Sequence, residues 1–490
     1  MRRVPRHLKS DESFVEKIAM GATGGRRVCD HLRSHGHHPL ELERGALSYK
    51  IWQGIKLKRL RVPDILCVNC GTRVEARAKT TLEISMSHST ADPERGWDYG
   101  LVANDYIAFV LCDRHGDEPQ DWSASDLVQY VRVADLKEAE RAGRVSVTAP
   151  KGREEGFETR IQWPVAVANY AGTVTVITRD SVMYQREEDG RTIPLKLERR
   201  GVSIEPIVQV GDTVSRGRIL AAPVPVRTML ACAHDRCADD YIGQMNSPDM
   251  HERYAAAKAL SVMWSAAARR VLESAVGDPR EEPIVRLEAA ATLMKQGIEA
   301  GREHVAEVLA TDYDAERLEA TVVLAEVGTN EAGTLLARVL LDQDQHADVR
   351  AGAAWALGEI GTRSAIPHLV AAFSALGVGV KADAARALST IAREHVEDVI
   401  GALSEAPRDA RAGIAWALAH TDAVDIERLL NQTVDDETRR WAAYVVGNHQ
   451  RDGFVPAALE RLRDADPEVY FAATVLWQVA CSWIDGLEEY

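Results

Sequence analysis

The chain of 490 residues is too long for one ordinary hydrophobic core and is expected to form about three domains. Its composition, 46% hydrophobic and 27% charged, is that of a soluble globular protein. The sequence has no run of about 18 apolar residues, so we expect no association with a membrane. The basic opening of the chain is followed by no apolar stretch typical of a secretion signal, so we expect a cytoplasmic location.

The net charge of −15 argues against nucleic acid as a partner, but the charge is unevenly distributed. Residues 1–80 carry 17 Lys and Arg against 8 Asp and Glu, whereas residues 151–490 carry 36 against 53. Because residues 1–80 are basic, DNA binding by this part of the chain is still compatible with the sequence. Seven thinly spread cysteines argue against a secreted disulfide framework and leave metal binding or reduced thiols.

The N-terminal pattern predicts an α+β domain over residues 1–145. A helix is expected over residues 12–36, with a glycine-marked break in its middle. A short strand, a hairpin over residues 61–79 and a strand over residues 105–113 follow. This order of elements indicates a central sheet.

The predicted hairpin brings two carboxylates together. A two-residue turn at Asn69 and Cys70 pairs residues whose numbers sum to 139, so Asp64 faces Glu75 at a Cβ separation of about 5 Å. Side chains alternate along a strand, which places Arg77 and Lys79 on the same face as Glu75. Carboxylates facing each other need a compensating charge, which Mg²⁺ or Mn²⁺ could supply.

At these residues the chain resembles the PD-(D/E)XK nuclease superfamily, whose Mrr-like members have the restriction-endonuclease-like fold. The resemblance rests on Pro63-Asp64, a ten-residue spacer, and Glu75 followed by a basic residue. It implies that Asp64 and Glu75 bind the metal, that Glu16 of the first helix joins them, and that a lysine assists the attacking water. The chain departs from the family because Arg77 stands where the lysine is expected. Arginine is a poor proton acceptor, so either Lys79 has taken the role or the site is weakened.

Two cysteine motifs suggest a structural zinc ion. Cys67-Val-Asn-Cys70-Gly has the form of a zinc knuckle, and Cys112-Asp-Arg-His115 has a similar shape at the end of a predicted strand. Together they would supply three cysteines and one histidine; the alternative is that these cysteines are simply reduced. A further candidate motif, with no evident fourth ligand apart from His251, comprises Cys232, His234 and Cys237.

Residues 146–230 are expected to form a small β-rich module. Short β-branched runs and regularly placed glycines between residues 171 and 224 indicate an all-β unit. Its last segment, PIVQVGDTVSRGRILA, resembles the barrel-sandwich hybrid of lipoyl domains. The lysine hairpin that carries the lipoyl group has no counterpart here, which favours a structural or docking module.

The C-terminal part, residues 231–490, contains an internal repeat. Eight similar segments end at residues 260, 293, 324, 357, 388, 418, 446 and 476, a spacing of 28–33 residues typical of helical-hairpin solenoids. The segment DVRAGAAWALGEIG (348–361) resembles short HEAT repeats, which implies an all-α solenoid of about eight repeats that binds proteins or nucleic acid. A basic residue precedes each of the first seven anchors by seven positions and either holds phosphates or ties neighbouring repeats together. These residues are Arg253, Arg286, Arg317, Arg350, Lys381, Arg411 and Arg439.

The leading hypothesis is therefore a metal-dependent DNA endonuclease with a HEAT scaffold, in restriction, phage defence or DNA repair. The alternative is a non-catalytic HEAT adaptor whose nuclease-like domain only binds DNA. A third interpretation relates the repeats to the short-repeat chromophore lyases. If Asp64, Glu75 and Lys79 converge, the enzyme is favoured; if Lys79 points away and Glu75 pairs with an arginine, the scaffold is favoured. The oligomeric state has no signal in the sequence.

Overall fold

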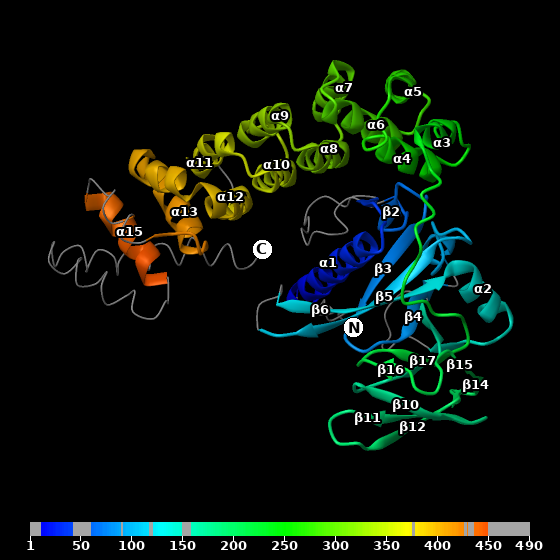
Figure 1. Cartoon of the computed structure of the whole chain (residues 1–490). Coiled ribbons are helices and arrows are strands. Elements are labelled where there is room, and N and C mark those ends of the chain that lie inside the picture. The colour runs from blue at the N-terminus through cyan, green and yellow to red at the C-terminus, as the bar shows by residue number, and fades with distance from the viewer. Residues whose placement is uncertain are drawn as a thin grey trace, which may run out of the picture. The chain divides into compact units, whose positions relative to one another are not determined.

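The computed structural model describes residues 11–42, 60–89, 92–116, 121–148, 158–374, 378–425, 429 and 436–448. It shows an N-terminal region with several sheets and a C-terminal all-α region, as predicted (Figure 1). The chain divides into two compact units whose boundary lies between Ala268 and Arg269, and each is described by itself. The domain boundaries at residues 145 and 230 stay a prediction.

A five-stranded sheet forms the centre of the first unit, in the order β1-β2-β3-β5-β6. Strands β3 and β5 are parallel and the other neighbours are antiparallel. The strands are β1 (Pro39–Glu41), β2 (Ile65–Cys67), β3 (Arg73–Lys79), β5 (Tyr106–Arg114) and β6 (Trp122–Arg132).

Helix α1 (Asp11–Ser34) covers one face of this sheet, where Val28 and Leu32 pack in one core with Val74. The helix is continuous, so the expected break at its glycines is wrong. A Cβ atom on Gly24 would lie 2.8 Å from the Cβ atom of Ala78 in β3. The glycine is therefore explained by the close approach of helix and sheet rather than by a break.

The register of the hairpin agrees with the prediction. Ile65 pairs with Val74 and Leu66 with Arg73, so the residue numbers sum to 139. Gly71 has a φ of +70° and its N–H donates to the carbonyl of Cys67, which closes the turn. Glycine suits this position because a side chain would be strained there.

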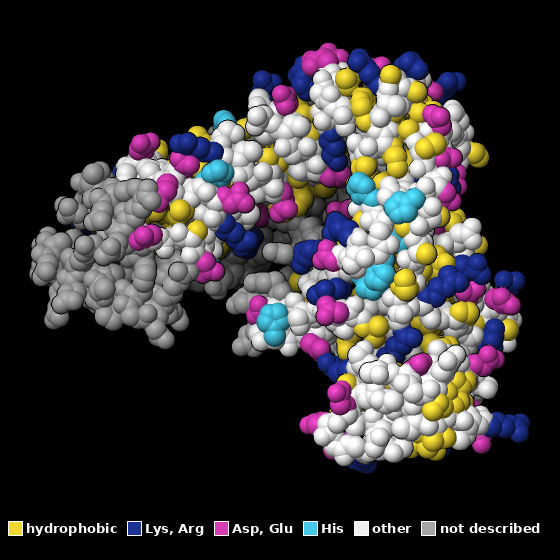
Figure 2. All heavy atoms as spheres, viewed as in Figure 1, with side chains coloured by type: hydrophobic (Ala, Val, Ile, Leu, Met, Phe, Trp, Pro, Cys, Tyr) yellow, Lys and Arg dark blue, Asp and Glu magenta, His cyan; other side chains and the backbone are white. Residues whose placement is uncertain are grey.

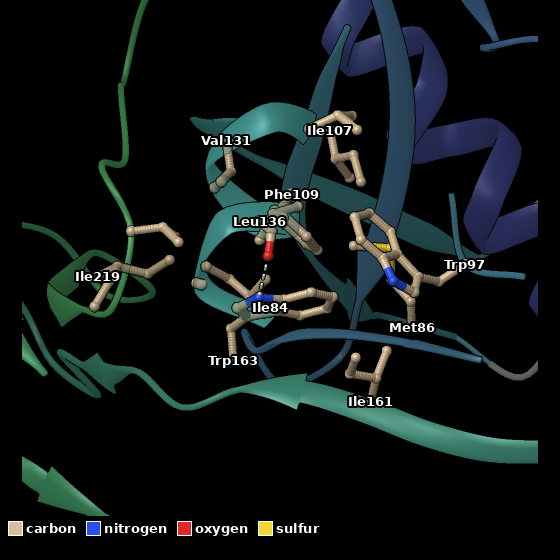
Figure 3. Close-up of a cluster of buried hydrophobic side chains, with 14 of the residues drawn as sticks. Ile84, Met86, Trp97, Ile107, Phe109, Val131, Leu136, Ile161, Trp163 and Ile219 are labelled. Atoms are coloured by element: carbon tan, nitrogen blue, oxygen red, sulfur yellow. Dashed lines mark hydrogen bonds between the residues drawn. The ribbon is translucent and has the colours of Figure 1, made fainter. Parts of the chain in front are cut away.

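The other face of the sheet is covered by a second hydrophobic core (Figure 3). The buried Trp163 donates its indole N–H to the carbonyl of Leu136 at 3.1 Å and meets Trp97 edge to face at 5.0 Å. This hydrogen bond satisfies the polar atom of a fully buried tryptophan. The surrounding elements are η1 (Pro93–Arg95), α2 (Val133–Arg141) and a sheet of β4 (Ile84–Ser89), β8 (Glu158–Trp163) and β7 (Ser146–Thr148).

Of the strands described within residues 146–230, β7 and β8 belong to the sheet with β4, and the nine short strands that follow Trp163 are fastened to the central sheet. The amide of Gln129 in β6 donates to the carbonyl of Gly217 at 2.9 Å and accepts from the N–H of Ile219 at 2.8 Å. The likeness to a barrel-sandwich hybrid stays a prediction. The strands are β9 (Ala166–Val167), β10 (Gly172–Ile177), β11 (Ser181–Arg186), β12 (Thr192–Lys196), β13 (Glu198–Arg199), β14 (Val202–Ser203), β15 (Glu205–Pro206), β16 (Thr213–Val214) and β17 (Ile219–Ala222).

Two helices, α3 (Ala238–Gln244) and α4 (Met250–Ala259), follow the module and return to the first half of the unit. The hydroxyl of Tyr241 donates to the carbonyl of Val68 at 2.8 Å, and that of Tyr254 donates to the carbonyl of Leu42 at 3.1 Å. Both rings are buried. The two tyrosines therefore attach these helices to the hairpin and to the end of β1.

Stacked helix pairs form the second unit (Figure 1). The first helices of successive pairs pack on one another, and the predicted repeat anchors from 293 to 446 fall within them. The anchor at 260 lies in the first unit, directly after α4, and the anchor at 476 lies outside the described residues. Helix α12 has a non-helical backbone at His395 and so comprises two successive helices. The helices, after the boundary helix α5 (Ala266–Gly277), are α6 (Pro283–Lys295), α7 (Glu299–Leu309), α8 (Asp314–Val327), α9 (Asn330–Leu341), α10 (Ala347–Ile360), η2 (Arg363–Ala365), α11 (Ile366–Ser374), α12 (Val378–Glu405), α13 (Arg408–Ala419) and α15 (Asp436–Asn448).

Candidate functional site

The two carboxylates of the hairpin already have partners within the protein. Asp64 lies just before β2, and its Oδ2 accepts the backbone N–H of Ala76 at 2.7 Å. Glu75 Oε1 lies 2.7 Å from Nη2 of Arg77, so an arginine supplies the compensating positive charge that the sequence assigned to a metal ion. The arginine that replaces the expected lysine thus has a structural explanation.

Lys79 and Glu16 are also engaged. Lys79 Nζ donates to the carbonyl of Ser85 at 2.9 Å and to its hydroxyl at 3.2 Å. Burial lowers the pKa of Lys79 to about 8, partly offset by the nearby carboxylate of Glu83. Glu16 forms an ion pair with Arg114 at 2.6 Å.

These contacts meet the condition stated above for a scaffold, because Glu75 pairs with Arg77 and β4 holds Lys79. Nothing in the described part of the chain supports a magnesium site at Asp64, Glu75 and Glu16. The catalytic roles of these residues stay a prediction.

A different set of side chains does converge, and we call it the Cys3His cluster: His37, Cys67, Cys70 and Cys232. One donor atom of each lies within 4.8 Å of the others. Cys67 Sγ is 3.8 Å from Cys232 Sγ, and Cys70 Sγ is 3.6 Å from His37 Nδ1. His37 follows α1, Cys67 ends β2, Cys70 lies in the turn, and Cys232 lies between β17 and α3.

The donors are held in place by their neighbours. His37 is buried and its Nε2 lies 3.1 Å from the carbonyl of Leu230, to which it donates when Nδ1 faces the sulfur. The Cys67 thiol, hydrogen-bonded to Cys70, lowers the pKa of Cys70 to about 4, while the same bond and burial raise the pKa of Cys67.

The residues expected to bind zinc come together only in part. Cys67 and Cys70 meet as the knuckle predicts, but Cys112 and His115 are not in the cluster. Cys112 is buried in the core beneath α1, where burial raises its pKa to about 11, and the N–H of His115 donates to the carbonyl of Asp121. Their places are taken by His37 and Cys232.

The second predicted cysteine motif is likewise divided. Cys237 is exposed, and its backbone N–H donates to the carboxylate of Asp240 at the start of α3. His251 Nδ1 lies 2.7 Å from a carboxylate oxygen of Asp249. The sequence suggested Cys232 as a metal ligand, but in a separate motif. Its separation of 165 residues from Cys67 matches no recognisable ligand spacing, so the two cysteines could not be assigned to one site.

In the second unit, the basic residues of the repeats tie neighbouring helices together. Arg286 Nε donates to the carbonyl of Val276 at 3.0 Å, and Arg350 Nε to that of Leu340 at 2.9 Å. Arg411 does the same to Ala406 at 3.0 Å. Each guanidinium binds a carbonyl at the end of the preceding helix, which that helix leaves without a helical partner. For Arg286, Arg350 and Arg411 these contacts favour the structural alternative, although the partner in each of them is a backbone carbonyl, whereas the sequence suggested a nearby aspartate (Asp348, Asp409 or Asp436).

The first helices are largely buried but leave one row of side chains accessible, which we call the first-helix ridge. Its members occupy the positions two before and two after the repeat anchor. They are Val322 and Glu326 of α8, Trp355 and Glu359 of α10, Arg386 and Thr390 of α12, and Trp416 and His420 of α13, of which only Trp416 is buried.

One contact along the ridge joins adjacent repeats: Lys295 of α6 forms an ion pair with Glu326 of α8 at 3.0 Å. Within α13, the rings of Trp416 and His420 stack at 3.9 Å. Desolvation by the surrounding protein raises the pKa of Glu359. Within the described residues, Glu359 has neither a hydrogen bond nor an ion pair through its side chain. The surface of the helical region otherwise mixes basic, acidic and hydrophobic side chains on the face shown in Figure 2.

Comparison with known proteins supports the class of the helical unit. Residues 303–389 match the family model of HEAT repeats. The complex of CpcE and CpcF of phycocyanin lyase from Nostoc sp. PCC7120 is similar at 20% identity over 46% of this chain and 92% of that one, with a TM-score of 0.25. Human deoxyhypusine hydroxylase is similar at 18% identity over 44% and 84%, with a TM-score of 0.18.

A search of curated proteins finds no match. The protein therefore has a C-terminal HEAT-repeat region preceded by a β-rich region with several sheets. None of its described helices is both long enough and apolar enough to span a bilayer.

Proposed function

We propose that the protein is a non-catalytic scaffold that binds a partner protein along the first-helix ridge. The observation that supports this proposal is the ridge itself: in four successive HEAT repeats the side chains at the same two positions of the first helix are accessible, with the exception of the buried Trp416. Solenoids of this kind use such continuous surfaces to bind extended partners. The partly accessible tryptophan Trp355 supplies an aromatic anchor of the kind on which protein interfaces depend.

The partner segment is expected to be basic. Residues 231–490 carry 24 Lys and Arg against 43 Asp and Glu, a net charge of −19. On the ridge, Glu359 lies one helical turn from Trp355 without a basic partner among the described residues. A lysine or arginine of the partner would pair with the carboxylate and lie against the indole ring, an arrangement that stabilises cations by about 0.5–2 kcal/mol. The long-range charge would also speed association at low salt.

The experiment is fluorescence anisotropy with a labelled Lys- and Arg-rich peptide and a matched Glu-rich peptide, both added to the full chain. We expect salt-sensitive binding of the basic peptide alone. The double variant Trp355→Ala/Glu359→Gln should weaken it by about tenfold or more, because an aromatic contact and a charge pair are lost together. Tyr313→Ala is the matched control, since Tyr313 is an exposed aromatic residue at the start of α8 that lies off the ridge.

Two results would contradict the proposal. If the basic peptide fails to bind, the partner chemistry is wrong. If Tyr313→Ala weakens binding as much as the ridge variant does, the interaction is a general effect of negative charge and not a property of the ridge.

The DNA endonuclease is the second candidate. It is supported by the hairpin, in which the Asp64 carboxylate accepts the N–H of Ala76, the residue after Glu75, and by the basic composition of residues 1–80. Cleavage of supercoiled, linear and branched DNA with Mg²⁺ or Mn²⁺ tests it. Metal-dependent cutting that is lost in both Asp64→Ala and Lys79→Ala would establish the enzyme in place of the scaffold.

A further inference from the structure

We propose that the Cys3His cluster binds one structural Zn²⁺ ion, which fastens the segment before α3 to the β2–β3 hairpin. This proposal is independent of the ridge and of any partner. It differs from the ligand set that the sequence suggests, because two of the four donors come from segments that no motif connects.

The donor separations fit a tetrahedral zinc ion. Zn–S bonds of about 2.3 Å and Zn–N bonds of about 2.0–2.1 Å at tetrahedral angles put two sulfurs about 3.8 Å apart and a sulfur and a nitrogen about 3.5 Å apart. The corresponding distances are 3.8 Å between Cys67 Sγ and Cys232 Sγ, and 3.6 Å between Cys70 Sγ and His37 Nδ1. The convergence of all four donor atoms within 4.8 Å of one another, and not either distance alone, points to one shared ion.

The histidine is oriented as a metal ligand. Its Nε2–H points to the carbonyl of Leu230 at 3.1 Å, so the free lone pair is on Nδ1, the atom that faces Cys70. Zinc-bound histidines commonly donate their second ring N–H to a carbonyl or carboxylate in this way. The ring is buried, which fixes its direction.

Backbone N–H groups surround the sulfurs. The N–H of His38 lies 3.4 Å from Cys67 Sγ, the N–H of Thr72 donates to Cys70, and that of His234 donates to Cys232. Such donors offset the negative charge of thiolates gathered on one ion. With four protein ligands the coordination is complete, so the ion would be structural and not catalytic.

A disulfide between Cys67 and Cys232 is the competing explanation for their proximity. It would join only two of the four groups and would leave the approach of Cys70 to His37 unexplained. It would also require the sulfurs to close from 3.8 Å to about 2.05 Å, which moves Cys67 away from the other donors.

The ion would hold together three segments that are distant in the sequence. Where they meet, the N–H of Arg236 donates to the carbonyl of Asn69 at 3.0 Å, and Tyr241 reaches the carbonyl of Val68. Binding at Cys232 would therefore fix the entry into α3 and, through α3, the position of α4. Loss of zinc should loosen these helices without unfolding the central sheet.

The test is the zinc content of the full chain, purified under reducing conditions and measured by inductively coupled plasma mass spectrometry. We expect about one zinc ion per chain, falling to near zero in Cys70→Ser and in Cys232→Ser. His38→Ala and Cys237→Ser are matched controls, because His38 is the exposed neighbour of His37 and Cys237 lies five positions after Cys232. Both should keep their zinc.

Cobalt substitution provides a test that does not depend on the cysteine-to-serine variants, which could fail to fold. The wild type loaded with Co²⁺ should show thiolate-to-cobalt charge-transfer bands and the intense visible bands of a tetrahedral ion. His37→Cys should keep a tetrahedral site and gain charge-transfer intensity from a fourth sulfur.

Three outcomes would overturn the proposal. They are a folded, reduced wild type that contains no zinc and takes up no cobalt, equal metal loss in the two controls, and a Cys67–Cys232 disulfide found by mass spectrometry of the untreated protein. Hydrogen exchange gives an independent readout: metal removal should increase exchange in α3 and α4 and leave β5 protected.

Discussion

A single methyl group on Gly301 should separate two helices of the HEAT region. Gly301 is the third residue of α7 and is buried against α6. A Cβ atom there would lie 2.4 Å from the carbonyl oxygen of Ala290 and 2.7 Å from the backbone nitrogen of Met294. Both are backbone atoms that no rotamer change can move, so Gly301→Ala forces α7 away from α6.

The magnitude follows from two opposing terms. Replacing glycine by alanine inside a helix gains about 1 kcal/mol, and overpacking a rigid contact costs about 1–3 kcal/mol, here near the upper end. Gly301→Ala should therefore lower the free energy of unfolding by about 2 kcal/mol. The control is Gly333→Ala in α9, where the new Cβ atom meets nothing within 4 Å and only the gain of about 1 kcal/mol applies.

The assay is urea unfolding followed by circular dichroism, with hydrogen exchange in α6 and α7 to localise the effect. The two variants should differ by about 3 kcal/mol in opposite directions from the wild type. The reasoning about close helix packing is refuted if Gly301→Ala is as stable as Gly333→Ala.

Three other substitutions test separate contacts. Arg350→Met should cost about 1–3 kcal/mol and increase hydrogen exchange in α9 and α10, because the carbonyl of Leu340 loses its donor in a buried place; an unchanged exchange pattern would contradict that role. Lys79→Met should remove a pH dependence. The folded pKa of Lys79 is about 8 and its ordinary value is 10.5, so the unfolded chain binds more protons between these values and the wild type gains stability as pH rises, by up to about 3 kcal/mol relative to the variant. Urea unfolding of both proteins at pH 7 and at pH 10.5 measures this change. If the free energy of unfolding changes equally with pH in the wild type and in the variant, the prediction is disproved. Asp64→Ala should lower stability, because the N–H of Ala76 loses its acceptor, while leaving zinc content unchanged by mass spectrometry; a parallel loss of zinc would show that the hairpin carboxylate supports the Cys3His cluster.

The features that the sequence predicted well are local or periodic. The repeat anchors lie in the first helices because burial of one helix face imposes a pattern that recurs with each pair. The hairpin register agrees with that expected from a turn centred on Asn69 and Cys70, although the Gly71 N–H donates to the Cys67 carbonyl and the loop is therefore longer than two residues. In both cases a few neighbouring residues decide the outcome.

The candidate site was predicted less well because its parts meet only in three dimensions. Cys67 and Cys70 form a recognisable pair, but His37 stands in a run of histidines and Cys232 in a separate motif. The predicted partners failed for a physical reason: Cys112 points from β5 into the core under α1. Alternation along β5, read together with the side of the sheet that α1 covers, would have excluded it.

Charge patterns misled for a related reason. A carboxylate, an arginine and a lysine on one strand face look alike whether they bind a metal or each other. Glu75 is satisfied by Arg77 from the same strand, whereas Lys79 reaches β4, whose position the sequence did not reveal. Residue types at a spacing therefore define a candidate, and only their partners define a site.

The distance along the chain between Cys67 and Cys232 has a consequence during synthesis. The 165 residues that separate them take roughly 8–33 s to translate at about 5–20 residues per second. During that time the hairpin can form, but the thiols of Cys67 and Cys70 lack Cys232, the last member of the cluster to be synthesised. The nascent chain is thus exposed to oxidation or to incorrect metal capture at Cys67 and Cys70 until the segment before α3 arrives.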